Sequence, residues 1–165
     1  MKFQSHEKYA KMTRALARLE RTYTETGNAI STADARDATE NFFNHAYHLK
    51  DYLQKDFPGM AQRVEKYITG SRVLSLVADL HNSFKHGGDI ANRRRKHEKE
   101  SGSPPVGDLV RINTHTKVDL DTTTAKCSQR MEITFQNATF DALQLATETV
   151  REWDSFLAAE GITLA

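Results

Sequence analysis

The sequence predicts a mainly α-helical fold, a four-helix up-down bundle with a β-hairpin inserted before the last helix. Four long segments carry apolar residues three and four positions apart, which is the spacing of an amphipathic helix. Between the third and fourth segments the spacing changes to two, as in a half-buried strand. A chain of 165 residues is long enough for one hydrophobic core. We therefore expect residues 1–165 to form a single helical-bundle domain.

The first two helices are predicted over about residues 5–26 and from Ser31 or Thr32 to about Asp56. Ser and Thr are favoured at the N-cap because the side-chain oxygen accepts a hydrogen bond from a free backbone N–H. A Pro-Gly pair beyond Asp56 ends the second helix. The apolar stripe expected on the first helix is Tyr9, Met12, Leu16, Leu19 and Tyr23.

A short helix over about residues 60–68 leads into a central helix, 71–86, and the last helix is expected over 140–160. The expected apolar face of the central helix is Val73, Leu76, Val77, Leu80 and Phe84. A narrow polar stripe beside that face consists of Ser75, Asp79, Asn82 and His86. An exposed helix face normally collects Lys and Glu, and this stripe has neither. It is therefore a candidate site.

Two further segments separate the central helix from the last one. Residues 88–105 are predicted to be a basic, mobile loop, because they combine glycines, a cationic run and a Ser-Gly-Ser-Pro-Pro stretch. Residues 108–118 and 126–136 alternate apolar and polar side chains and are predicted to form an antiparallel hairpin. Two strands alone are marginally stable in water. The hairpin is therefore expected to lie against the helices or to pair with another chain.

Composition indicates an ordinary cytoplasmic protein. The formal net charge of +1 favours no class of partner. A single cysteine, Cys127, excludes an intramolecular disulfide and is typical of a reducing compartment. No apolar run is long enough to span a membrane, and the first residues lack the apolar core of a signal peptide. We expect a cytoplasmic location and no membrane partner.

The two middle helices carry an unusual set of polar residues. His45, His48 and Asp51 lie on the helix that ends near Asp56, and the central helix adds Asp79, Asn82 and His86. Helices joined by short connections usually pack as neighbours, so these side chains are expected to line one groove. Such a cluster is either a site that binds or cleaves a polar ligand or a structural hydrogen-bond network.

Acid–base cleavage of a phosphodiester is one chemistry open to this cluster. His86 would transfer protons, because an imidazole titrates near neutral pH. Asn82 or Lys85 would hold a phosphate oxygen. A metal site is the other chemistry, but His48 followed three residues later by Asp51 reverses the Glu-x-x-His order of carboxylate-bridged metal bundles. We expect no metal and no other cofactor.

A basic cluster follows the central helix. It consists of Arg93, Arg94, Arg95, Lys96 and His97. A run of this kind is either a solvated loop or a landing site for phosphates.

Two stretches resemble known signatures. Residues 44–53, NHAYHLKDYL, and 78–87, ADLHNSFKHG, are similar to the paired HLKDW and DLxNxxKH signatures of a family of small uncharacterised bacterial and phage helical proteins. More distantly, the chain resembles the HEPN superfamily of helical domains. Its signature is Arg, a polar residue, three to five further residues, and His. Here His86 matches the His, and the positions for Arg hold Asp79, Leu80 and His81.

The HEPN resemblance implies a homodimer that binds or cleaves RNA or another nucleotide ligand without a metal. The candidate site residues are His48, Asp51, Asp79, Asn82, Lys85 and His86. Phosphate contacts are expected from Arg93, Arg94, Arg95 and Lys96. The alternative is a non-enzymatic interaction or scaffold protein in which the same cluster is a structural network. In that case the hairpin edge or the basic loop would be the binding surface.

Overall fold

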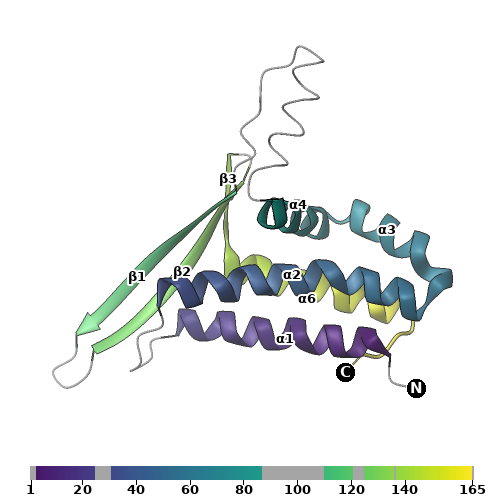
Figure 1. The fold of residues 1–165 in the computed structure, drawn as a ribbon, viewed down its shortest axis with the longest axis horizontal. Helices are drawn as coiled ribbons and strands as arrows, with labels where there is room; N and C mark the ends of the chain where they lie inside the picture. The colour runs from purple at the N-terminus through teal and green to yellow at the C-terminus, as the bar shows by residue number, and fades with distance from the viewer. Residues whose placement is uncertain (1–2, 25–30, 87–109, 121–124, 136, 165) are drawn as a thin grey trace, which may run out of the picture.

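The computed structural model describes most of the chain. The described residues are 3–24, 31–86, 110–120, 125–135 and 137–164 (Figure 1). The predicted loop at 88–105 and its basic cluster lie outside the described residues.

The described part of the chain holds five α-helices and a three-stranded sheet. The helices are α1 (Gln4–Tyr23), α2 (Thr32–Asp56), α3 (Ala61–Gly70), α4 (Arg72–His86) and α6 (Ala142–Ala159). The strands are β1 (Arg111–Leu120), β2 (Ala125–Phe135) and β3 (Ala138–Asp141), antiparallel in the order β1-β2-β3. A mainly helical fold with β-structure inserted before the last helix is thereby confirmed.

The boundaries of α2 follow from local chemistry. The Oγ of Ser31 accepts a hydrogen bond from the Asp34 backbone N–H at 3.0 Å, so Ser31 is the N-cap. The Ser31 hydroxyl in turn donates to the Asp34 carboxylate at 2.6 Å. The helix ends at Asp56 because Pro58 starts a short 3₁₀ turn, Pro58–Met60, which leads into α3.

Helix α2 lies at the centre of the fold. It contacts α1, α3, α4 and α6 as well as β2. Figure 1 shows α1, α2 and α6 running side by side, with α3 and α4 across α2 from α1. The largest fully buried side chains include Phe42, Phe43, Leu49, Leu53, Leu80 and Trp153. One flank of α2 therefore faces α1 and the other faces α4.

The buried face of α4 differs from the predicted one. Its buried residues are Leu74, Val77, Leu80 and His81. Three residues of the predicted face are only partly buried, and these are Val73, Leu76 and Phe84. The face is rotated because Leu74 packs into the core and His81 stacks on Tyr47 of α2.

The sheet has one strand more than the predicted hairpin. Residues 138–141 form β3, although the last helix was expected to begin at about 140. Asn137 makes the turn between β2 and β3 at φ 62°, a left-handed conformation that Asn tolerates. The Oδ1 of Asp141 accepts a hydrogen bond from the Gln144 N–H at 2.9 Å, so α6 starts after this N-cap.

The sheet packs on the helices through β2. The buried side chains of β2 alternate along the strand: Gln129, Met131, Ile133 and Phe135. β2 contacts α1, α2 and α6. Of the two arrangements expected for the hairpin, packing against the helices is therefore the one the structure shows.

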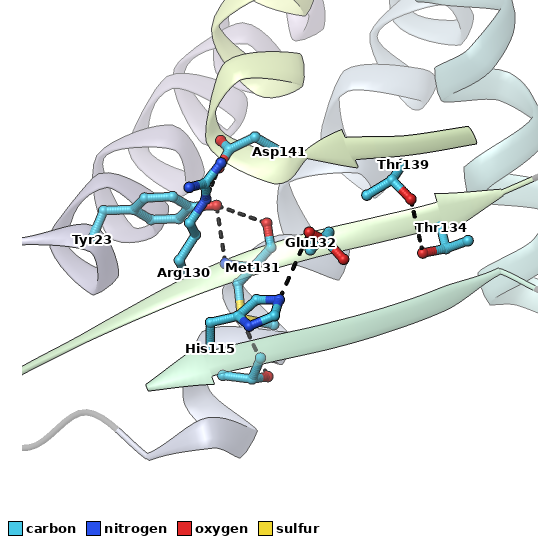
Figure 2. Close-up of polar contacts among 9 residues, drawn as sticks. Tyr23, His115, Arg130, Met131, Glu132, Thr134, Thr139 and Asp141 are labelled. Atoms are coloured by element: carbon cyan, nitrogen blue, oxygen red, sulfur yellow. Dashed lines mark hydrogen bonds and ion pairs between the residues drawn. The ribbon is translucent and has the colours of Figure 1, made fainter. Parts of the chain in front are cut away.

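The hydroxyl of Tyr23, on α1, bonds to the backbone of β2 (Figure 2) and to the backbone of α6. It donates to the Met131 carbonyl at 2.9 Å and accepts from the Met131 N–H at 3.0 Å and the Leu143 N–H at 3.3 Å. β3 ends at Asp141, which pairs with Glu132, so the backbone of Met131 has no partner in β3. The Tyr23 hydroxyl forms the hydrogen bonds that such a partner would make. Burial raises the pKa of Tyr23, which keeps the hydroxyl neutral.

Tyr23→Phe is expected to lower the free energy of unfolding by about 1–3 kcal/mol, because it leaves partly buried backbone groups of Met131 and Leu143 without this partner. Urea denaturation measures the change. Tyr9→Phe is the matched control on the same helix. Its hydroxyl donates to Asp154 at 2.6 Å in an exposed position, where water replaces the lost bond. An equal loss in the two variants would contradict this role of Tyr23.

Candidate functional site

Helix α2 presents polar side chains to both of its helical neighbours. His45 faces α1, where its Nδ1 lies 3.1 Å from Nζ of Lys8. His48, about one turn further, faces α4, where its ring centroid lies 4.6 Å from that of His81. Three residues turn an α-helix by about 300°, so the two imidazoles lie about 60° apart around α2. One contacts α1 and the other contacts α4.

The environment of His45 is strongly cationic. Burial lowers its pKa, and the charges of Lys8, Lys11, His48 and Arg14 lower it further. The ring is consequently neutral at pH 7, and its Nδ1 accepts a hydrogen bond from the Lys8 ammonium group. This geometry leaves Nε2 as the donor of the ring.

Lys8→Met is expected to raise the pKa of His45 toward the ordinary value of about 6.5, because it removes the nearest positive charge. The lowered pKa also means that the unfolded chain binds a proton at higher pH than the folded chain. Stability therefore falls as the pH drops from about 6.5 through the folded-state pKa, and the variant weakens this dependence. NMR titration of the His45 ring measures the shift. Lys66→Met, on α3, is the control, and an unchanged His45 pKa in Lys8→Met would contradict the contact.

His48 is held by the carboxylate one turn further along α2. Its Nδ1 lies 2.7 Å from Oδ2 of Asp51. The His48 side chain is 33% exposed and that of Asp51 49%. A carboxylate bonded to Nδ1 fixes the tautomer and leaves Nε2 for proton exchange with a ligand.

His81 is the site residue that the sequence analysis did not select. It is 5% exposed and stacks on Tyr47, with ring centroids 4.3 Å apart and ring planes 14° from parallel. It meets the His48 ring edge to face, at 79°. In the sequence it lies two residues after Asp79 and one before Asn82, on a different face of the helix from the polar stripe that was selected.

A cavity of about 360 Å³ opens between α2 and α4. Its lining residues are Glu40, Asn41, Asn44, His48, His81, Phe84 and Lys85. We call it the α2–α4 cavity. It combines two imidazoles, two amides, an ammonium group and one aromatic ring. The carboxylate of Glu40 is paired with Arg36, whose Nε lies 3.2 Å from Oε1.

Two more cavities adjoin it on the α1 side. One, of about 380 Å³, shares His48 and is lined by Gln4, Lys8, His48, Asp51, Tyr52 and Lys55. The other, of about 450 Å³, shares Asn41 and is lined by Lys11, Arg14, Ala15, Arg18, Ala38, Asn41 and His45. We call the latter the α1–α2 groove.

The predicted site residues are only partly brought together. His48 and Lys85 line the α2–α4 cavity, and Asp51 reaches it through its bond to His48. Asp79 and Asn82 are half-buried on α4 and do not line this cavity. The reason is rotation: at 100° per residue they lie about 200° and about 100° from His81 around the helix.

Other predicted residues cannot be placed in the site. α4 ends at His86, but the side chain of His86 is not among those that the structure describes. Arg93, Arg94, Arg95 and Lys96 lie outside the described residues. Among the side chains described, no group of three or more His, Cys, Asp or Glu residues is arranged to hold a metal ion. None of the described helices has both the length and the hydropathy to cross a lipid bilayer.

Comparison of the chain with protein-family models, curated proteins and solved structures gave no match. The chemistry of the site is therefore argued from its geometry.

Proposed function

We propose that this protein binds single-stranded RNA at the α2–α4 cavity and cleaves the RNA backbone by acid–base catalysis that needs no metal. His48 is the proton-transfer group and Asp51 is its orienting partner. An HEPN-like up-down bundle that works as a homodimer in the cytoplasm is part of the same proposal.

The observation that carries the proposal is the imidazole of His48 in the α2–α4 cavity. It is bonded through Nδ1 to Asp51 at 2.7 Å, and it is partly exposed beside a second imidazole. This is the arrangement that a positioned general base requires. Lys85, Asn41 and Asn44 supply N–H donors around the same space, and phosphate oxygens are good acceptors for such donors.

The reaction uses the 2′-hydroxyl of RNA as the nucleophile. His48 takes the proton from this hydroxyl while its oxygen forms a bond to phosphorus. The bond from phosphorus to the 5′-oxygen breaks, and that oxygen receives a proton from His81 or Lys85. The products are a 2′,3′-cyclic phosphate and a 5′-hydroxyl. Because the nucleophile is the 2′-hydroxyl, this step needs no metal-activated water.

The test is cleavage of an end-labelled RNA of mixed sequence by the purified protein in EDTA. We expect fragments that carry a 2′,3′-cyclic phosphate, and no cleavage of a DNA of the same sequence because it lacks the nucleophile. Cleavage only when a divalent metal is added, or cleavage of the DNA as well, would contradict the acid–base mechanism.

The burial of His81 favours a second candidate, a non-enzymatic scaffold in which the imidazoles form a structural network. His81 is 5% exposed and is stacked on Tyr47. In this case His81→Ala is expected to lower the free energy of unfolding by about 1–3 kcal/mol, because the buried ring loses its stacking on Tyr47 and its contact with His48. The protein then binds no RNA at this face. RNA affinity therefore separates the two candidates.

A further inference from the structure

We infer that the α1–α2 groove is a phosphate subsite for the RNA strand that enters the α2–α4 cavity, so that the ligand is an oligonucleotide and not a single nucleotide. This inference rests on the proposed function and names the substrate class of the same face. It assigns a role to Arg14 and Arg18, which are not among the site residues predicted from the sequence.

The shape of the groove follows from two alanines. Ala15 of α1 and Ala38 of α2 both line it and are 6% and 4% exposed. Because both side chains are small, they leave space open between α1 and α2 at this point. α1 contributes Lys11, Arg14 and Arg18 to the lining, and α2 contributes Asn41 and His45.

The lining of the groove is cationic and contains no carboxylate. Lys11 has an acidic partner, Glu7, at 2.8 Å. Within the described part of the chain, Arg14 and Arg18 have no acidic side chain within ion-pairing distance. His45 lines the groove together with Lys11, Arg14 and Arg18. Burial lowers the pKa of His45, and the positive charges of Lys8, Lys11, His48 and Arg14 lower it further. An anion would relieve this repulsion.

Phosphate is the anion that these donors fit. A guanidinium group presents a planar fork of N–H donors that matches the oxygens of a phosphate, and both arginines of the groove offer one. Asn41 adds an amide, and the neutral His45 ring adds an N–H donor.

The groove and the α2–α4 cavity share one lining residue. Asn41 lines both of them, so it stands at the junction. A strand with one nucleotide at His48 can thus pass Asn41 and place its next phosphates beside Arg14 and Arg18. A mononucleotide fills only one of the two spaces.

The test is a binding series with fluorescent, 2′-O-methylated RNAs of one, two, four and six nucleotides, which the protein cannot cleave by the proposed route. The variants are Arg14→Ala, Arg18→Ala and the double variant. Arg151→Ala, an exposed arginine on α6, is the control. We expect the wild type to bind the longer RNAs more tightly. The double variant should lose about 10-fold or more in affinity for the hexanucleotide and reduce the salt slope by about two.

Three results would overturn the inference, and they fall differently on the proposed function. In the first result, the wild type and the double variant bind the hexanucleotide equally, and Lys85→Ala binds it more weakly. The α1–α2 groove is then not a phosphate subsite, and the proposed binding site at the α2–α4 cavity stands. In the second result, Arg151→Ala loses as much RNA affinity as the double variant. The inference is then wrong, because affinity depends on the total positive charge of the protein and not on the groove. No binding of any RNA by the wild type overturns the groove and the proposed function together.

Discussion

His48→Ala is expected to lower the rate of RNA cleavage in EDTA by about 10²–10⁴-fold, because it removes the general base at the α2–α4 cavity. The fold should survive this change. The His48 side chain is 33% exposed and its hydrogen-bonded partner, Asp51, is 49% exposed, so water replaces the lost bond. Initial rates on an end-labelled RNA measure the effect, with circular dichroism as the check on folding.

Two further variants test the assignment. Asp51→Asn should lower the rate by less than His48→Ala, since it removes the group that orients the ring and not the ring that exchanges the proton. His115→Ala, on the exposed face of β1, is the control and should leave the rate unchanged. Full activity in His48→Ala would contradict the proposed mechanism outright.

Trp153→Ala is expected to lower the free energy of unfolding by about 3–5 kcal/mol, the range for truncating a fully buried tryptophan. The side chain is 1% exposed, and its Nε1–H donates to the Ala46 carbonyl of α2 at 3.1 Å. It also packs edge to face on Phe156. The variant therefore loses a large buried contact and the hydrogen bond that joins α6 to α2, the helix that carries His48.

Urea denaturation measures this change. Trp153→Phe keeps most of the buried area and loses only the hydrogen bond, so its loss should be smaller, about 1–3 kcal/mol. A loss below about 1 kcal/mol in Trp153→Ala would contradict the packing of α6 against α2.

The helices were predictable because their signals are local. Spacing placed α2 and α4 within one or two residues, and Ser31 was named as a possible N-cap. β3 was missed because four residues give no alternation to detect, and because Phe140 also fits the apolar face of the helix that follows. The turn at Asn137, which creates this strand, depends on one residue in a left-handed conformation.

The site was less predictable because it depends on which helices meet and at what rotation. The sequence placed His48 and Asp51 on one face of α2, and their hydrogen bond follows from that spacing. It could not show that His81, and not Asp79, turns toward them, since that depends on the packing of Leu74 in the core. Arg14 and Arg18 were not selected, because only the packing of α2 beside α1 brings them together with Asn41 and His45.

The central claim is that RNA occupies the α2–α4 cavity, and NMR titration with an uncleavable, 2′-O-methylated RNA hexanucleotide tests it most directly. The predicted result is a saturable shift in the ring signals of His48 and His81 and in the side-chain amide signals of Asn41 and Asn44, with His115 on β1 unaffected. Shifts confined to the sheet, or no shift at saturating ligand, would contradict it.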